Sequence, residues 1–525
     1  MQVLVYGLKK ICLASNYTSG YIFRWLPMIH VRAENKSSNG SLASKEVFRY
    51  SRGLFRMGML RPIKAIHLIY LYLFLSGGCV NLSDDDKTTP GTLPIQTSFK
   101  VEDFTSAEEC AVCHPQHYAE WSSSMHAYSI MDPVWISLQN KQQVHNLANG
   151  VEIGDFCVQC HSPVAALTNL VENHLELSAE LINTFPPQVK EGVTCDACHL
   201  TTHLPDPTNI SIVDHDYETV DFKLYSDDTR YGILDDPIDN EFHNSVYHPG
   251  YDKSEFCQNC HNLTVDGRNA EITQFEWDGT AFQAMGMECQ SCHMPNYTGQ
   301  AAMDGPERDN LHRHFFPGID EALIDFPGKS GQRQEIEGLL QTAAEINLFD
   351  TPPDTITAGT VWNAKLIVSN NTGHNFPSGT TFARQLWIEL IATVSNDTIL
   401  ASGQLNADGD LLDFYTDPSG ELDPQLHMFN TILFNADGDS GLLAVSVENM
   451  VAMTDRTLPV SGSRTVNYSI NIPAGIEGEL HFSARLRFRS FPPFFLRHIN
   501  LESLIGNVNI FDVDLLTRTL YVSSS

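Results

Sequence analysis

The sequence predicts an α+β fold, in which a loop-rich, mainly α-helical region over residues 105–340 precedes an antiparallel, immunoglobulin-like β-sandwich over residues 341–525. Two observations predict it. Between residues 105 and 320 the chain is rich in Cys, His, Pro, Gly, Asn and Asp and has few long periodic runs. Beyond about residue 340 it has no cysteine, and apolar residues recur at every second position, as they do along half-buried strands.

The N-terminal segment has the composition of an export address. In residues 59–79, basic residues precede an apolar run and then small residues and Cys79, which is the order of a secretory signal peptide. A cysteine at this point resembles the lipobox of bacterial lipoproteins and predicts lipidation of Cys79; an ordinary signal peptide with an incidental cysteine is the alternative. Residues 80–104 predict a flexible tether. Residues 1–58 carry no pattern, and we expect them to be unstructured or to precede the true translation start.

Helical spacing predicts two helices, one over residues 115–125 and one over the first part of residues 332–348, where Ile336, Leu340 and Ala343 recur on one face. The alternating pattern predicts strands at residues 362–368, 385–395, 398–405, 430–434, 443–449, 466–472, 480–488 and 508–522. Seven or eight short strands separated by turn clusters are typical of an antiparallel sandwich, whose expected role is mainly to pack against the preceding region.

The charge of the chain excludes one large class of partners. Residues 1–78 hold 11 Lys/Arg and 2 Asp/Glu, whereas residues 79–525 hold 21 Lys/Arg and 62 Asp/Glu, so the body of the protein carries a formal charge of −41. Such a surface repels phosphate backbones and anionic lipid headgroups, because nucleic-acid binding needs clustered Lys and Arg. We therefore expect no nucleic-acid partner, and membrane contact only through the lipid anchor.

Five copies of one motif, Cys-x-x-Cys-His, account for every cysteine of the loop-rich region. They are Cys110, Cys113 and His114; Cys157, Cys160 and His161; Cys195, Cys198 and His199; Cys257, Cys260 and His261; and Cys289, Cys292 and His293. This pattern is the attachment signature of haem c: the two thiols form thioethers with one haem, and the histidine supplies the proximal nitrogen to iron. Paired zinc sites and disulfides would not need a histidine after each pair. The sequence therefore predicts five covalently attached haems c, stacked within the region and supplying much of its buried apolar surface.

The sixth ligand of each iron decides what its haem can do. A second histidine gives a closed, one-electron site, whereas a vacant or water-bound position can bind substrate. Besides the five proximal histidines, ten others lie between residues 105 and 320: His117, His126, His145, His174, His203, His215, His243, His248, His312 and His314. This number exceeds the five that are needed, so spacing alone leaves the pairing open.

With these motifs, roughly residues 105–380 resemble the multihaem c-type cytochromes related to the tetrahaem electron carrier of the hydroxylamine-oxidation pathway. The stretch from Cys110 through Tyr118-Ala-Glu-Trp-Ser-Ser-Ser-Met to His126 is similar to that family's first haem segment, which implies that His126 is a distal ligand. The segment Phe-His243-Asn-Ser-Val-Tyr-His248-Pro resembles stretches that supply a ligand to a neighbouring haem, and both of its histidines compete for that role.

Two further segments carry the resemblance. His314-Phe-Phe-Pro-Gly resembles a recurrent ligand segment, with His312 as the alternative. The segment Thr-Gly-His374-Asn-Phe-Pro-Ser-Gly resembles a loop often found after multihaem regions, which implies that His374 reaches back from the sandwich to cap a haem. A loop histidine that forms only local hydrogen bonds is the other interpretation of His374. The fifth distal ligand stays open among His145, His203 and His248.

The leading hypothesis is an exported pentahaem c-type cytochrome, a periplasmic or outer-membrane, cell-surface lipoprotein. It would carry single electrons along stacked haems between redox protein partners with basic surfaces, with no catalytic residue. Two alternatives stay open: a multihaem oxidoreductase acting on a small nitrogen or sulfur compound at one open haem, and a subunit of an oligomeric or filamentous haem wire. The sequence lacks the Cys-x-x-Cys-Lys variant that would favour the oxidoreductase.

Overall fold

The computed structural model describes residues 98–148, 156–171, 176–201, 210–213, 216–217, 228–265, 268–413, 420–435 and 450–524. The chain divides into a unit of Met1–Thr89 and a unit of Pro90–Ser525, and every described residue lies in the second. Residues 1–58, the expected signal peptide with Cys79, and most of the expected tether lie outside the described residues. Within the described ranges no helix is long and apolar enough to cross a membrane.

The end of the expected tether belongs to the folded unit. Val101–Asp103 form the 3₁₀ helix η1, and Phe104 is buried in a cluster that includes Val158 and Ile182. An apolar side chain buried in this way has left water and stabilises the fold, so the folded unit begins before residue 105.

Short helices carry the cysteine-rich region. They are α2 (Ala107–Ala111), α3 (Pro115–Trp121), α4 (Met125–Tyr128), η2 (Ser129–Met131), α5 (Pro133–Ala148), α6 (Phe156–His161), α7 (Pro163–Leu167), α8 (Ala179–Ile182), α9 (Pro187–Lys190), α10 (Cys195–His199), η3 (Pro249–Asp252), η4 (Ser254–Phe256), α11 (Gln258–His261), α12 (Thr273–Trp277), α13 (Ala281–Ala284), α14 (Cys289–His293) and α15 (Lys329–Ala343). The helix expected over residues 115–125 is broken at its serines, because the Ser124 hydroxyl caps a new helix by accepting from the Ala127 N–H at 3.3 Å.

The same region also contains short strands, so its expected description as mainly α is incomplete. They are β1 (Ile210–Val213), β2 (Asp216–Tyr217), β3 (Thr229–Gly232), β4 (Asn244–Tyr247), β5 (Leu263–Val265), β6 (Arg268–Glu271), β7 (Asn296–Gln300) and β8 (Glu307–His312). β2-β1-β5-β6 form one small sheet, while β3 with β4 and β7 with β8 form two-stranded pairs. Most of these strands are too short and polar to show the alternation by which strands are predicted.

Side chains form a small core around the second motif. Ile130, Trp135, Val164 and Leu200 are buried together there with other apolar residues. The expectation that porphyrins supply much of the buried surface therefore does not extend to this part of the region, where α5 to α9 pack on one another as in an ordinary helical domain.

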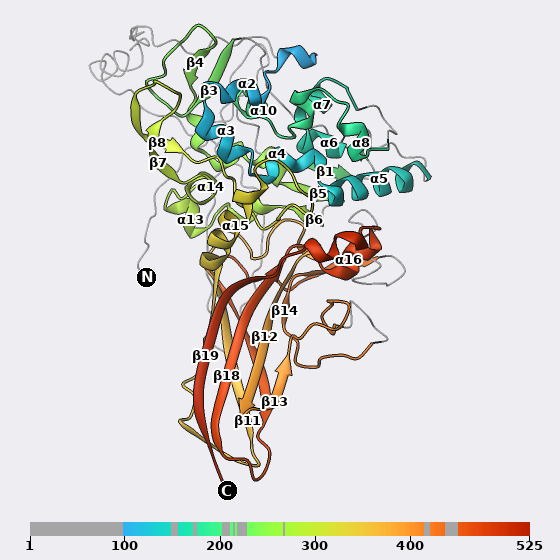
Figure 1. The fold of residues 1–525 in the computed structure, drawn as a ribbon, viewed down its shortest axis with the longest axis vertical. Coiled ribbons are helices and arrows are strands. Elements are labelled where there is room, and N and C mark those ends of the chain that lie inside the picture. The colour runs from blue at the N-terminus through green and yellow to red at the C-terminus, as the bar shows by residue number, and fades with distance from the viewer. Residues whose placement is uncertain are drawn as a thin grey trace, which may run out of the picture. The chain divides into compact units, whose positions relative to one another are not determined.

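Two sheets form the C-terminal part (Figure 1), and the side chains between them make one hydrophobic core. The larger has the order β10-β19-β18-β12-β13, with β14 also paired to β12, and the smaller has the order β17-β11-β9. Their strands are β9 (Ala344–Leu348), β10 (Thr355–Thr357), β11 (Val361–Asn370), β12 (Gln385–Val394), β13 (Asp397–Ser402), β14 (Met428–Phe429), β17 (Ser463–Asn471), β18 (Gly478–Arg489) and β19 (Phe511–Ser523), and β15 (Thr431–Asn435) pairs with β16 (Met450–Asp455) beside them. Trp362 of the smaller sheet meets Phe482 of the larger with ring centroids 5.3 Å apart.

The period-two segments of the sequence coincide with β11, β12, β13, β17, β18 and β19, and the segment at 430–434 coincides with β15. The expected strand at 443–449 lies outside the described residues. One pairing departs from the expected antiparallel arrangement, because β10 runs parallel to β19, with Thr355 opposite Tyr521.

A helical insertion between β18 and β19 joins the two parts of the unit, and the sequence patterns did not reveal it. It consists of α16 (Pro493–His498) and η6 (Glu502–Asn507). Phe494, Phe495 and Leu496 of α16 are buried in a cluster that includes Val134 of α5 and Leu323. The 3₁₀ turn η5 (Thr381–Ala383) also contributes to it, and Ser137 of α5 donates to the Ile499 carbonyl at 2.6 Å. The β part is therefore fastened to the cysteine-rich part by a dry apolar contact.

Candidate haem-binding centres

A turn of helix presents each motif. The second cysteine pair and its histidine lie within α6, the third within α10 and the fifth within α14, while α2 and α11 hold part of the first and fourth motifs. Positions i, i+3 and i+4 of a helix share one face. Two thiols and one imidazole therefore project to the same side of the backbone in each motif, as attachment of one haem requires.

The proximal imidazoles are oriented by backbone carbonyls in four motifs. The Nδ1–H of His114 donates to the Ala301 carbonyl at 2.7 Å, and that of His161 donates to the Ser129 carbonyl at 3.3 Å. In the same way His199 donates to the Tyr231 carbonyl at 2.7 Å, and His293 donates to the Pro317 carbonyl at 2.6 Å. A carbonyl can only accept, so each bond fixes the tautomer whose Nε2 carries a lone pair. That tautomer is the one that can coordinate iron through Nε2.

A second histidine stands across from the proximal one in four motifs. The ring centroids are 6.2 Å apart for His114 and His243, 6.3 Å for His199 and His314, 6.3 Å for His293 and His374, and 6.4 Å for His261 and His126. The ring planes of the first three pairs are inclined by only 24°, 23° and 22°, whereas those of the last pair are inclined by 60°.

This separation is the one expected for two imidazoles that share an iron. With metal–nitrogen bonds of about 2 Å on either side, and ring centres roughly 1.1 Å beyond the nitrogens, the centroids of two axial imidazoles lie about 6.2 Å apart. The four pairs thus fit haem with two histidine ligands.

Burial lowers the pKa of six of the proximal and facing imidazoles and so favours their neutral form, which is the form that ligates a metal. It lowers the pKa of His126 to about 3 and the pKa of both His161 and His293 to about 4. It also lowers the pKa of His199, His314 and His374.

The second motif is arranged differently. Among the described residues no histidine stands across from His161, whose ring instead stacks on Trp135 at 4.7 Å with an interplanar angle of 17°. The segments holding His174, His203 and His215 lie outside the described residues, as does the side chain of His145.

The structure does not bring His248 opposite any proximal histidine that it describes. Its Nδ1 accepts from the Gly250 N–H at 3.1 Å, which puts the ring proton of the neutral form on Nε2 and leaves that nitrogen without a lone pair for iron. His243 and His314, not their competitors His248 and His312, therefore occupy the facing positions. His312 instead donates from Nδ1 to the Met294 carbonyl at 2.6 Å.

Of the five proximal histidines, only His261 lies within ion-pair distance of a carboxylate among the described residues. Its Nδ1 lies 3.8 Å from Oε1 of Glu271, at the end of β6. Burial disfavours the charged imidazolium, but Glu271 outweighs burial and raises the pKa of His261 to about 9. Conversely, burial favours the protonated carboxyl, but His261 and Thr273 outweigh it and lower the pKa of Glu271. No pattern in the sequence points to this pair.

Contacts between thiols link the motifs in space. The thiols of Cys110 and Cys195, of Cys160 and Cys260, and of Cys257 and Cys289 each lie within hydrogen-bonding distance. The first motif is thus beside the third, and the fourth is beside both the second and the fifth. No disulfide joins any of the ten described cysteines.

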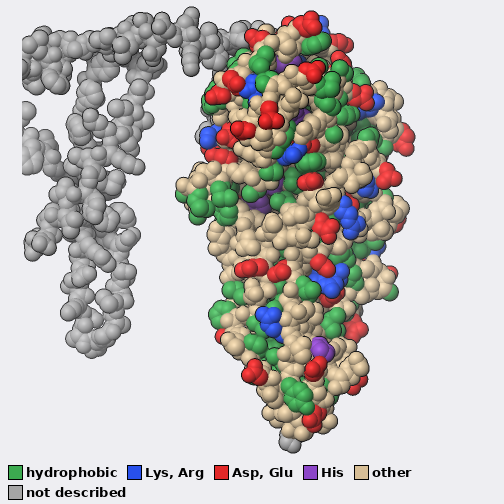
Figure 2. Space-filling view, turned by 60° about the vertical axis from the view of Figure 1, so that its left-hand side comes forward, with side chains coloured by type: hydrophobic (Ala, Val, Ile, Leu, Met, Phe, Trp, Pro, Cys, Tyr) green, Lys and Arg blue, Asp and Glu red, His purple; other side chains and the backbone are tan. Residues whose placement is uncertain are grey.

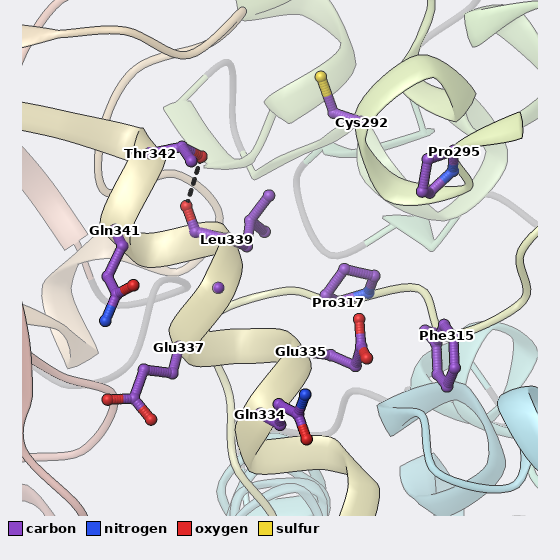
Figure 3. A pocket seen from close by; sticks show the side chains of 11 residues that line it. Cys292, Pro295, Phe315, Pro317, Gln334, Glu335, Glu337, Leu339, Gln341 and Thr342 are labelled. Atoms are coloured by element: carbon purple, nitrogen blue, oxygen red, sulfur yellow. Dashed lines mark hydrogen bonds between the residues drawn. The ribbon is translucent and has the colours of Figure 1, made fainter.

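A cavity of about 540 Å³ adjoins the fifth motif. Cys292 and Pro317 border it, and α15 closes it with Glu335, Leu339 and neighbouring residues; Figure 3 shows Leu339 and Glu335 projecting from α15 toward the side on which Cys292 and Pro317 lie. A volume of this size is typical of a cofactor site. Since the Pro317 carbonyl also orients His293, the cavity and the facing imidazoles belong to one site.

Glu276 of α12 holds the loop that carries His374. Its carboxylate accepts from the Asn375 backbone N–H at 3.1 Å, the Asn375 side-chain amide at 2.8 Å and the Ser378 hydroxyl at 2.6 Å. Burial raises the pKa of Glu276 to about 7. The β part therefore contributes to the fifth site through a loop that the cysteine-rich part fastens down.

Glu120 of α3 has a similar role at His314. This buried carboxylate pairs with Arg313 at 2.6 Å and accepts from the His314 backbone N–H at 2.8 Å. A charge-assisted bond to the backbone of a candidate ligand restricts where its imidazole can lie. The sequence resemblance included Glu120 but gave no reason to assign it this role.

Part of the chain matches a model of a known protein family. A family model described as cytochrome c554 and c-prime matches residues 109–200, which include the first three motifs. No curated protein matches the chain.

Among solved structures, a penta-heme cytochrome c552 from Thermochromatium tepidum matches with a TM-score of 0.52 at 19% identity, covering 80% of this chain and 100% of that one. The sporulation control protein Spo0M from Bacillus subtilis and AvmM, which catalyses macrocyclization in alchivemycin A biosynthesis, each cover 35% of this chain and 50% and 90% of their own. Their TM-scores are 0.15 and 0.17 at 7% and 13% identity, and they carry no argument. Together with the motifs, the family match and the pentahaem structure support a multihaem c-type cytochrome.

Proposed function

We propose that this protein is an exported pentahaem c-type cytochrome that passes single electrons along closely spaced haems. The observation that carries the proposal is the set of four facing histidine pairs, with centroids 6.2–6.4 Å apart, each beside a Cys-x-x-Cys pair. When bound, haem c supplies one-electron Fe(III)/Fe(II) chemistry. Closed histidine pairs suit a carrier, because they leave no position for a substrate.

The chain's own residues set the conditions for this transfer. The histidines would hold haem through ring nitrogens whose orientation is set by carbonyl acceptors such as those of Ala301 and Pro317. The thiol contacts between motifs support close packing of neighbouring haems. These contacts support a route from the first and third motifs to the fourth, and from there to the second and fifth, since Cys198 also lies near Cys257 and Cys260. Short spacing is what makes electron transfer through protein fast.

The charge supports partners with basic surfaces. The body of the chain is at −41, and Figure 2 shows acidic side chains spread over the face it presents. Opposite charge accelerates diffusional encounter, so redox proteins with Lys-rich or Arg-rich surfaces suit this protein. The signal-like segment before Cys79 supports export and anchoring as a periplasmic or outer-membrane lipoprotein, which brings such partners within reach.

Two finer assignments belong to the same proposal. The parallel pairing of β10 with β19 at the edge of an otherwise antiparallel pair of sheets supports an immunoglobulin-like sandwich for residues 344–524. The family match over residues 109–200 supports a relation to the tetrahaem carrier of the hydroxylamine-oxidation pathway.

Expression of the full chain in a host that matures c-type cytochromes tests the function. Mass spectrometry of the exported protein should show five covalently bound haems, and the ferric protein should show mainly low-spin spectra. A potentiometric titration should resolve several one-electron steps. A protein that carries zinc or bare thiols at the motifs, or ferric haems that are mainly high-spin, would overturn the proposal.

A further inference from the structure

The fourth motif differs from the other four in what its proximal imidazole faces. Backbone carbonyls, which are neutral, accept from His114, His161, His199 and His293. His261 faces the Glu271 carboxylate, with Nδ1 and Oε1 3.8 Å apart. This is longer than a hydrogen bond but within ion-pair distance.

The surroundings hold this carboxylate in place without neutralising it. The Thr273 backbone N–H donates to Oε1 of Glu271 at 3.1 Å, and the Glu271 side chain is only 19% exposed. Among the described residues no Lys or Arg lies within ion-pair distance of it. Gly379 makes room for it, because a Cβ at this position, where φ is +78°, would lie 2.7 Å from Oε2.

The geometry points to Glu271 as the residue that gives the haem of the fourth motif the lowest reduction potential of the five. This inference rests on the proposed function. A carboxylate that attracts the Nδ1 proton makes the imidazole a stronger electron donor through Nε2, and its charge stabilises ferric iron. A carbonyl does this more weakly because it carries no net charge.

The fourth motif lies between two others, so a low reduction potential there would affect electron transfer between them. The fourth motif touches the second through Cys160 and Cys260 and the fifth through Cys257 and Cys289. A low-potential centre between others stays oxidised while its neighbours are reduced. Electrons would therefore reside on either side of the fourth haem and cross it one at a time.

Electron paramagnetic resonance identifies this haem without mutation. Low-spin ferric haem with nearly parallel imidazole planes gives a rhombic signal, and strongly inclined planes give a more anisotropic one. The planes of His126 and His261 are inclined by 60°, against 22–24° in the other three facing pairs. Among the four haems with facing histidine pairs, the most anisotropic low-spin signal of the haem-loaded full chain is therefore assigned to the fourth motif.

The test is a potentiometric titration of the haem-loaded full chain followed by this signal. In the wild type the most anisotropic signal should be the last to disappear as the potential is lowered. Glu271→Gln should raise its midpoint by about a tenfold change in the one-electron equilibrium, which is 59 mV. The rhombic signals should keep their midpoints. Glu479→Gln is the matched control, because this exposed glutamate pairs in register with Tyr521 near the C-terminus and should leave all midpoints unchanged.

The outcomes separate the two proposals. An unchanged midpoint of the anisotropic signal in Glu271→Gln overturns the role of Glu271. Should that variant fail to assemble, Glu271→Asp withdraws the carboxylate by one methylene; a smaller upward shift supports the inference and no shift overturns it. A wild-type chain without low-spin haem signals would instead contradict the proposed function.

Discussion

Replacement of Glu276 by Gln should remove one defined contribution to the pH dependence of stability. Burial raises the pKa of this carboxyl from an ordinary 4.5 to about 7 in the folded protein. The folded state therefore holds the proton more tightly than the unfolded state. The stabilisation is complete below pH 4.5 and is lost as the pH rises through 7.

The magnitude follows from the two pKa values. A group that titrates at about 7 when folded and at 4.5 when unfolded contributes about 2.5 kcal/mol at pH 5 and almost nothing at pH 8. The amide introduced by Glu276→Gln would not titrate. It keeps one oxygen for the Asn375 N–H and the Ser378 hydroxyl but opposes the Asn375 side-chain amide, at a cost of about 1 kcal/mol that does not vary with pH.

Urea denaturation of the haem-loaded protein, followed by far-ultraviolet circular dichroism between pH 5 and pH 8, measures this. The free energy of unfolding of the wild type minus that of Glu276→Gln should fall by about 2.5 kcal/mol over the range. Glu479→Gln, a change of the same kind at an exposed site, should follow the wild type. Parallel pH profiles for the wild type and Glu276→Gln would refute the reasoning.

Four further outcomes are expected. His374→Ala should convert one ferric haem from low spin to high spin in the optical spectrum. His427→Ala is the control, because this half-buried histidine lies opposite no proximal histidine and its replacement should not change the spin state. Identical spectra for the wild type and His374→Ala would contradict the ligand assignment. Glu120→Ala should lower the free energy of unfolding by about 3 kcal/mol in urea titrations, because it leaves Arg313 and a backbone N–H without their acceptor, and a loss below about 1 kcal/mol would show that water replaces the carboxylate. Leu486→Ala, at a fully buried position of β18, should cost about 2–5 kcal/mol by the same measurement, and a smaller cost would show that the core can collapse around it. The association rate with a basic redox protein should fall as salt rises in stopped-flow experiments, and a rate independent of ionic strength would argue against electrostatic docking.

The parts of the site that are local in sequence could be predicted, and the parts that depend on tertiary contact mostly could not. Each thiol pair and its proximal histidine lie on one helical turn, so their common face follows from spacing. His374 entered as a candidate only through family resemblance, and only the resemblance singled out His126 among the ten histidines available. Nothing in the segment containing His243 and His248 distinguishes them, because the difference is which nitrogen keeps its lone pair, and Gly250 decides that through a backbone contact.

In the fold, too, features that are local in sequence could be predicted and features that depend on tertiary contact could not. The long strands β11, β12 and β18 could be predicted because one face of each is buried and alternation is strong. β10 was missed because only Ile356 of its three residues is buried. Glu271 and Glu276 act on histidines that come from other elements, and the pairing of distant acids with ligands leaves no periodic trace in a single sequence.

The contacts between thiols of different motifs constrain the order of events during maturation. Cys110 touches Cys195, and Cys160 touches Cys260, residues that are synthesised much later. In an oxidising compartment, a chain that reached this arrangement without haem would bring these sulfurs together and cross-link them. On the proposed function, attachment of the haems would therefore precede collapse of the chain.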